Sequence, residues 1–254
     1  MHPIDVSAHT NRWSHQHPLQ KLLLAGGTLL LSLLLPPLSA GPIILVGMAV
    51  LALLGAKVPA KTYFRLLAVP AGFAVTGAVP LAVSVSWESK GLELAYSPQG
   101  AATAVHVLMR AWAAVSCLLF LAMTTPLAAL VSQLRRLRIP GGIIELMLII
   151  YRMLWTLSDV FQKIRIAQAS RLGYCGLRQS YRSTAIVAAS LLGRVMNQAS
   201  RLETGLAARG YQGDLNVLTE DRFASSGAIA LTLAAQVSLI VVSLLLKGVF
   251  PCLK

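Results

Sequence analysis

Residues 66–87 read LLAVPAGFAVTGAVPLAVSVSW, a stretch of 22 residues without a charged side chain. A helix needs about 20 such residues to cross the hydrocarbon core of a bilayer. Four other stretches are also apolar and nearly uncharged, at 22–35, 42–56, 101–123 and 227–246. Because a backbone exposed to lipid must satisfy its own hydrogen bonds, we expect all five to be helices. The predicted fold class is therefore all-α, a polytopic membrane protein with about five transmembrane helices.

The composition of the whole chain agrees with a membrane protein. Of 254 residues, 56% are hydrophobic and 12% are charged, whereas soluble domains carry about 25% charged residues. The apolar content excludes a disordered chain, and three cysteines are too few for a disulfide scaffold. The net charge of +13 indicates an anionic partner, which could be nucleic acid, anionic lipid or an acidic protein.

The first two apolar stretches are short, and we expect them to form a helical hairpin. A tight turn between them is predicted at Pro36, Pro37, Gly41 and Pro42. A secretory signal is the alternative, because Arg12 and Lys21 precede the first stretch and residues 38–40 resemble a cleavage site.

The loops predict which way the chain faces, because Lys and Arg resist translocation across the membrane. Loops on one side of the predicted spans carry 18 Lys and Arg residues, and loops on the other side carry 3. We therefore expect a cytoplasmic N-terminus and an external C-terminus. This orientation divides the chain into a membrane part at 1–123, a cytoplasmic helical domain at 124–226, and the last span with the C-terminus at 227–254.

The stretch 143–157 within the cytoplasmic domain is apolar enough to be a sixth span, which would reverse the sidedness of all that follows. However, Glu145, Arg152 and Asp159 recur at intervals of seven along one helical face. We therefore favour an amphipathic helix, either at the membrane surface or packed in a cytoplasmic bundle. Its opposite, apolar face would consist of Ile143, Met147, Ile150, Leu154 and Leu157.

Two predicted helix ends in this domain share one pattern, ASRLGY at 169–174 and AARGY at 207–211. In each, small residues precede an Arg and a Gly follows it, which favours a helix that ends in a left-handed glycine cap. The small neighbours leave the guanidinium clear of its own helix, so that a groove of a partner can enclose it. Because QASRL occurs at both 168–172 and 198–202, Arg201 competes with Arg209 for the second role. The predicted contact residues are Ser170, Arg171, Leu172, Ala208, Arg209 and Gly210.

These residues resemble the transmembrane T component of energy-coupling factor (ECF) transporters, and within it the cobalt-transport family CbiQ. The similar motifs are TTP at 124–126, LRRL at 134–137, IP at 139–140, IEL at 144–146, YR at 151–152 and ARGY at 208–211. The last motif is the more specific of the family's two arginine signatures. The first is ordinarily Ala-Arg-Gly and is represented here by Ser170-Arg171-Leu172, so only its Arg carries over.

The resemblance implies a non-catalytic subunit of the bacterial inner membrane. It would sit on two ABC-type ATPases similar to CbiO, and hold a substrate-capture subunit similar to CbiM with a small accessory subunit similar to CbiN. ATP and magnesium would bind the ATPases, cobalt would be the transported ion, and no cofactor is expected on this chain. Nickel or a vitamin is the alternative substrate.

His106 and Arg110 lie one turn apart near the middle of the 101–123 stretch. Ionisable residues at that depth face protein or water. They are a candidate contact with the capture subunit, and a hydrogen bond to a neighbouring helix carbonyl is the alternative. No metal site is expected, although imidazole binds cobalt and nickel, because irregular spacing favours solvated side chains for His2, His9, His15 and His17.

The sequence has no motif from which a catalytic site could be predicted. It has no phosphate-binding Gly-x-x-x-x-Gly-Lys-Ser/Thr, no His-Glu-x-x-His, no Gly-x-Ser-x-Gly and no cysteine pair at zinc spacing. We therefore expect no catalytic residues, with energy supplied by a partner. A membrane-bound enzyme and a membrane-anchored nucleic-acid binder are the alternatives, and the second lacks an evident surface on which bases could stack.

Overall fold

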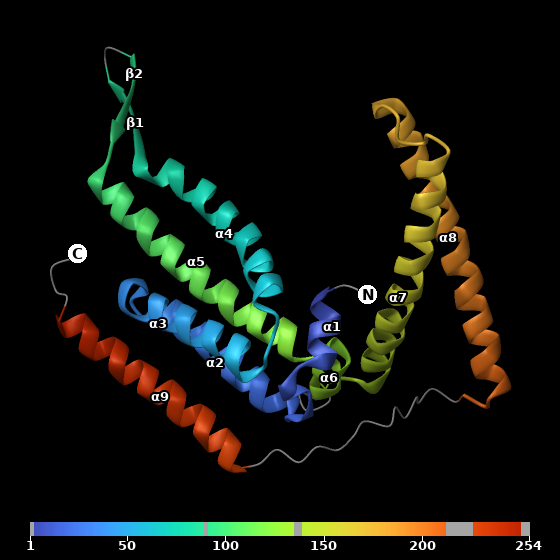
Figure 1. The fold of residues 1–254 in the computed structure, drawn as a ribbon, viewed down its shortest axis with the longest axis horizontal. Helices are drawn as coiled ribbons and strands as arrows, with labels where there is room; N and C mark the ends of the chain where they lie inside the picture. The colour runs from blue at the N-terminus through green and yellow to red at the C-terminus, as the bar shows by residue number, and fades with distance from the viewer. Residues whose placement is uncertain (1–2, 89–90, 135–138, 212–225, 250–254) are drawn as a thin grey trace. The chain divides into compact units, whose positions relative to one another are not determined.

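The computed structural model describes residues 3–88, 91–134, 139–211 and 226–249 (Figure 1). The chain divides into two compact units. Unit 1 comprises Met1–Leu130 and Asp221–Lys254, and unit 2 comprises Val131–Glu220. Within these described residues, helices dominate both units, which confirms the predicted all-α polytopic membrane protein, and a short β-hairpin in unit 1 departs from it.

Each of the five predicted spans corresponds to a helix of unit 1. Within the described residues, α3 with its π-helical extension η2, α4 and α5 are long and apolar enough to cross a membrane, while α2 and α9 have shorter apolar segments. The short helices α1 and η1 precede α2, and α6 follows α5. The bounds are α1 (Pro3–Thr10), η1 (Arg12–His15), α2 (Pro18–Leu34), α3 (Pro37–Val50), η2 (Leu51–Gly55), α4 (Ala60–Ala82), α5 (Pro98–Thr124), α6 (Leu127–Gln133) and α9 (Ser226–Val249).

The predicted third span, 66–87, is wrong at its C-terminal end. Helix α4 stops at Ala82, and β1 (Val83–Glu88) pairs antiparallel with β2 (Gly91–Tyr96). Figure 1 shows this hairpin at the ends of α4 and α5. The sequence VSVSW alternates apolar and polar residues, which is the period of a strand, and valine favours extended backbone. The lack of charged residues over 66–87, from which the span was predicted, concealed that alternation.

The helical hairpin of α2 and α3 is confirmed, but its turn is shorter than predicted. Only Leu35 and Pro36 separate the two helices. Pro37 is the first residue of α3, where the missing N–H costs no hydrogen bond, and Pro42 lies inside α3.

Helix α5 is the centre of unit 1 and packs against α1, α2, α3 and α4. The core between these helices is rich in small residues, including Ala25, Ala40 and Ala113, which let helix backbones approach closely in a membrane. Larger side chains pack near the C-terminal end of α5, which is predicted to face the cytoplasm. There the Trp13 and Phe120 rings meet edge to face, with their centroids 5.7 Å apart.

Two polar side chains close the C-terminal end of α5. Lys21 is 2% exposed and donates from Nζ to the carbonyl oxygen of Thr124 at 2.8 Å. Asn11 donates from Nδ2 to the carbonyl oxygens of Met123 and Thr124, each at 3.2 Å. The last carbonyls of a helix have no partner within the helix, so these contacts fasten the N-terminal segment to α5.

Unit 2 contains two long helices, α7 (Gly141–Ser170) and α8 (Leu177–Ala208), connected by residues 171–176. On the charged face of the predicted amphipathic helix 143–157, Glu145 is buried, with 4% of its surface exposed. Conversely, the predicted apolar face is partly open in this chain, since Ile143, Ile150 and Leu154 are 47%, 49% and 53% exposed. The first turn of α7 is therefore buried on its charged side.

Candidate functional site

The two arginines singled out in the sequence occupy equivalent positions at two helix ends. Arg171 is the C-terminal capping residue of α7, with φ −98° and ψ 20°. Arg209 is the C-terminal capping residue of α8, with φ −95° and ψ 8°. The structure therefore places both guanidinium groups where two long helices stop.

Each end has the hydrogen-bond pattern of a Schellman motif, which satisfies the last helix carbonyls. After Arg171, the Leu172 N–H donates to Ala169 and the Gly173 N–H to Gln168, at 3.1 and 2.8 Å. After Arg209, the Gly210 N–H donates to Ala207 and the Tyr211 N–H to Leu206, at 3.0 and 3.1 Å. The two helix ends therefore have the same hydrogen-bond pattern, with the Arg at the same position in each.

The predicted glycine cap is confirmed at one end and wrong at the other. Gly210 has φ +72°, but at the α7 end it is Leu172, with φ +56°, that adopts the left-handed conformation. Gly173 lies one residue further on, where an added Cβ would come within 2.7 Å of both the Gln168 carbonyl and the Ser183 hydroxyl. The glycine is required there for close packing rather than for the cap itself.

Both arginines are exposed, as are Ser170, Leu172, Ala208 and Gly210. Among the residues that the structure describes, none forms an ion pair or a side-chain hydrogen bond with either guanidinium. Each group keeps its five N–H donors available for carboxylates or carbonyls of another molecule.

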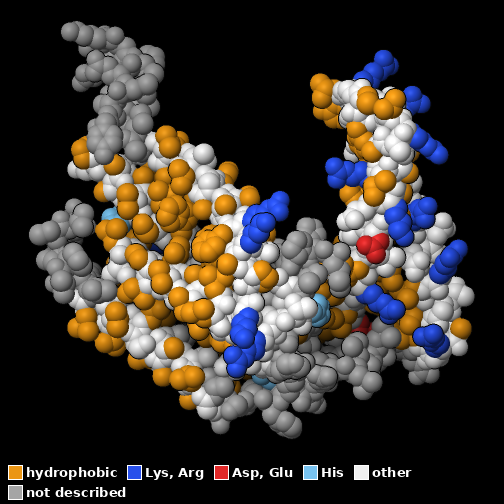
Figure 2. Space-filling model, in the orientation of Figure 1, with side chains coloured by type: hydrophobic (Ala, Val, Ile, Leu, Met, Phe, Trp, Pro, Cys, Tyr) orange, Lys and Arg blue, Asp and Glu red, His pale blue; other side chains and the backbone are white. Residues whose placement is uncertain are grey.

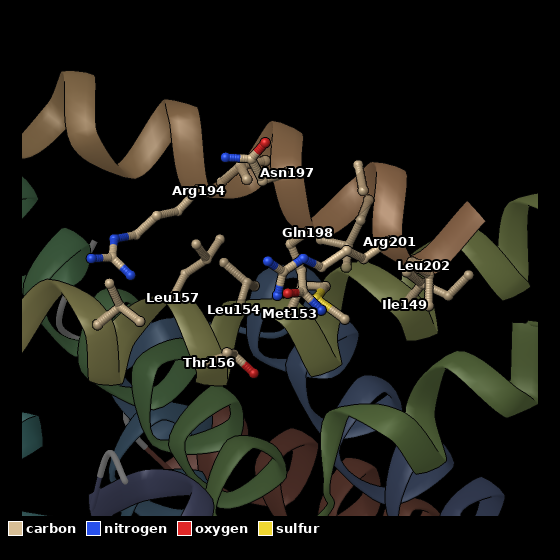
Figure 3. Close-up of a pocket in the computed structure, with 14 residues that line it drawn as sticks. Ile149, Met153, Leu154, Thr156, Leu157, Arg194, Asn197, Gln198, Arg201 and Leu202 are labelled. Atoms are coloured by element: carbon tan, nitrogen blue, oxygen red, sulfur yellow. The ribbon is translucent and has the colours of Figure 1, made fainter. Parts of the chain in front are cut away.

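Arg201, the competitor for the role of Arg209, lies inside α8 rather than at a helix end. Together with Arg194 it lines a groove of about 500 Å³ between α7 and α8 (Figure 3). The α7 side of the groove is mostly apolar and includes Ile150, Met153 and Leu154. Arg201 therefore differs from Arg209 in its surroundings, although Arg209 caps the helix in which Arg201 lies.

Two hydrogen bonds that link α7 and α8 were not predicted from the sequence. Ser183 Oγ of α8 donates to the carbonyl oxygen of Gly173 at 2.7 Å, and Tyr211 OH donates to Glu145 Oε2 of α7 at 3.0 Å. The repeated pattern of Arg followed by Gly and Tyr includes Gly173 and Tyr211. Their hydrogen-bond partners lie elsewhere in the sequence, so the pattern could not predict them. Neither Glu145 nor Ser183 is part of the repeated pattern.

Basic side chains are spread over unit 2. Figure 2 shows Lys and Arg side chains along its visible face, interspersed with hydrophobic ones. Beside the turn that follows Arg171, the exposed Arg178 and Arg182 lie one helical turn apart on α8. Arg135, Arg136 and Leu137, which contributed to the family resemblance, lie outside the described residues, as do residues 212–225 at the end of the predicted cytoplasmic domain.

Arg110 lies at the thirteenth of the 27 residues of α5 and is exposed, and His106 is half-buried one turn earlier. Within the described part of the chain, no carbonyl accepts a hydrogen bond from the Arg110 guanidinium, which was the alternative to a partner contact. An exposed guanidinium at mid-span has a high cost in lipid.

The prediction that the N-terminal histidines are solvated is wrong for His17. Its side chain is 7% exposed, and Nδ1 accepts a hydrogen bond from the Leu19 N–H at 3.0 Å, which caps the start of α2. His9 is exposed on α1, His2 lies outside the described residues, and the side chain of His15 is not described.

The family model for CbiQ, described as cobalt transport protein, matches residues 10–220 of this chain. The cobalt transport protein CbiQ of Rhodobacter capsulatus is 40% identical over 243 residues, which cover 96% of this chain and 98% of that protein. CbiQ of Salmonella typhimurium is 32% identical over 223 residues, with 84% and 99% covered. A fused cobalt transport protein CbiMQ of Methanocorpusculum labreanum is 28% identical over 194 residues, which cover 73% of this chain and 32% of that protein. The chain therefore belongs to the CbiQ family of cobalt transport proteins.

Proposed function

We propose that this chain is the membrane-embedded coupling subunit of an ATP-driven cobalt importer of the ECF type. It would transmit the motion of partner ATPases to a substrate-capture subunit and would catalyse no reaction itself. The single observation that carries the proposal is the pair of exposed arginines at equivalent capping positions of α7 and α8. Cobalt is the substrate named for its relatives from Rhodobacter capsulatus and Salmonella typhimurium.

The arginine ends suit a contact that must hold while its partner moves. A guanidinium can form several charge-assisted hydrogen bonds at once, with carboxylates or with carbonyl groups. Ser170 and Ala208 beside them are small, so a groove of an ATPase could enclose each group. Each arginine would then contact one of two ATPase subunits, and a change in the separation of these subunits would pull on α7 and α8.

The capture subunit would contact the membrane part of this chain. The fused CbiMQ relative joins two cobalt transport components in one polypeptide, which supports a CbiM-like protein as the partner. The exposed Arg110 at mid-span supports a polar contact with a neighbouring membrane helix. The small accessory subunit remains an expectation from the family resemblance.

The test is a double charge reversal at the helix ends. Arg171→Glu with Arg209→Glu should abolish cobalt uptake and release the ATPases during purification, while the protein stays in the membrane. The matched control is Arg152→Glu with Arg165→Glu, which makes the same change of net charge at exposed positions inside α7. Normal transport by the first variant, or equal loss in both, would refute the proposal.

A further inference from the structure

The two arginine ends share a second feature beyond their caps. In each, the residue two positions after the Arg is hydrogen-bonded to the other long helix. Gly173 accepts from Ser183 Oγ of α8 at 2.7 Å, and Tyr211 donates to Glu145 Oε2 of α7 at 3.0 Å. These two contacts are called the cross-helix bonds below.

Burial in unit 2 is concentrated at the cross-helix bonds. Helices α7 and α8 are described throughout, and of their 30 and 32 residues only Ile144, Glu145, Ser183 and Val187 are buried. Between these points the helices leave the groove of about 500 Å³ shown in Figure 3. The helix pair is therefore closed at its two ends and open in the middle.

The two bonds differ in chemistry but have the same effect on geometry. A buried hydroxyl holds the carbonyl of Gly173, at a distance that only a residue without Cβ permits. A phenol holds the carboxylate of Glu145, which is 4% exposed. In both cases, the residue two positions after an Arg is hydrogen-bonded to the helix that the Arg does not terminate, through its carbonyl oxygen at Gly173 and through its phenol at Tyr211.

We propose that Ser183, Glu145 and Tyr211 are positioning residues that turn α7 and α8 into one rigid lever between the two arginines. The inference rests on the proposed coupling function. The 32 residues of α8 span about 48 Å at about 1.5 Å per residue, and the last turn of a free helix frays. Without the cross-helix bonds, displacement of an arginine would unwind its own helix end instead of moving both helices.

The test measures cobalt ions transported per ATP hydrolysed by the complete complex in lipid vesicles. Tyr211→Phe and Ser183→Ala each remove one hydroxyl. Their matched controls are Tyr181→Phe and Ser200→Ala, which make the same changes at exposed positions of α8. We expect the ratio to fall about tenfold for Tyr211→Phe and about fivefold for Ser183→Ala, the size of a lost hydrogen bond to a charged or neutral group, and to stay constant in both controls.

A distance measurement distinguishes positioning from a general loss of stability. Spin labels at the exposed Cys175 and at Thr204→Cys, an exposed position near the end of α8, in a chain with Cys117 and Cys252 replaced by Ala, report the separation of the two ends. We expect a narrow distribution in the parent complex and in Tyr181→Phe, and a broad one in Tyr211→Phe. Unchanged coupling or an unchanged distribution in Tyr211→Phe would each overturn the proposal.

The outcomes also separate this inference from the proposed function. If the Arg171 and Arg209 double variant loses its ATPases while Tyr211→Phe behaves like Tyr181→Phe, the lever is wrong and the coupling role stands. If the double variant keeps its ATPases and transports cobalt, the coupling role itself is wrong.

Discussion

Gly27 and Gln236 offer a sharp test of how α9 is held against α2 in unit 1. The Gln236 side chain donates from Nε2 to the carbonyl oxygen of Leu23 at 2.8 Å. A Cβ on Gly27 would clash with that amide, whereas a Cβ on the adjacent Gly26 would meet no atom within 4 Å. Gly27→Ala must therefore displace the amide, and Gly26→Ala serves as its control.

The expected magnitudes follow from these contacts. Loss of an interhelical hydrogen bond in a membrane costs about 0.6–2 kcal/mol, and overpacking adds little because the displaced amide is the end of a flexible side chain. Alanine in place of a helical glycine returns about 0.5–1 kcal/mol. We expect Gly27→Ala to lower the free energy of unfolding by about 0.5–1 kcal/mol, and Gly26→Ala to raise it by about 0.5–1 kcal/mol.

A double variant makes the test specific for this contact. In Gly27→Ala with Gln236→Ala, the new methyl group occupies space that the amide has vacated, so the two costs should not add. We expect the double variant to be more stable than the sum of the single variants predicts by about 1 kcal/mol, a coupling typical of residues in contact. Unfolding in mixed detergent micelles with increasing sodium dodecyl sulfate measures each value. Equal stability of the two glycine variants, or strict additivity, would refute the reasoning.

Three further predictions follow from the orientation, from α5 and from the helix caps. A membrane-impermeant maleimide should label Cys175 only in inside-out vesicles and Cys252 only in intact cells. The reverse pattern would favour a sixth span. Variants with each Cys replaced by Ser assign the two signals. Arg110→Leu should lower co-purification of the capture subunit about tenfold, as loss of a charged hydrogen bond would, whereas Arg110→Lys should retain it; equal retention would contradict a partner contact. Leu172→Gly should raise the free energy of unfolding by about 1 kcal/mol and Gly210→Ala should lower it by about 1 kcal/mol, because left-handed backbone disfavours a side chain. Thermal unfolding measures both effects. A melting temperature that shifts in the same direction for both variants would contradict this reasoning.

Local patterns in the chain were enough to predict most of the helices. Uncharged apolar stretches predicted the membrane helices because their length must match a bilayer, and the Arg-Gly pattern predicted where α8 ends because glycine favours a left-handed cap. The strand at Val83–Glu88 was also within reach of the sequence, since its residues alternate with a period of two. It was missed because apolar content was weighed above period.

Contacts between distant residues were decided only by the tertiary structure. Lys21 binds the carbonyl of Thr124 at the end of α5, which is 103 positions away in the sequence. Tyr211 binds Glu145, which is 66 positions away. The sequence placed Glu145 on the charged face of an amphipathic helix, and only the structure shows that its carboxylate is buried with a hydrogen-bond partner. Local periodicity describes which side of a helix is polar, but which polar group is desolvated depends on the donor that folding brings to it.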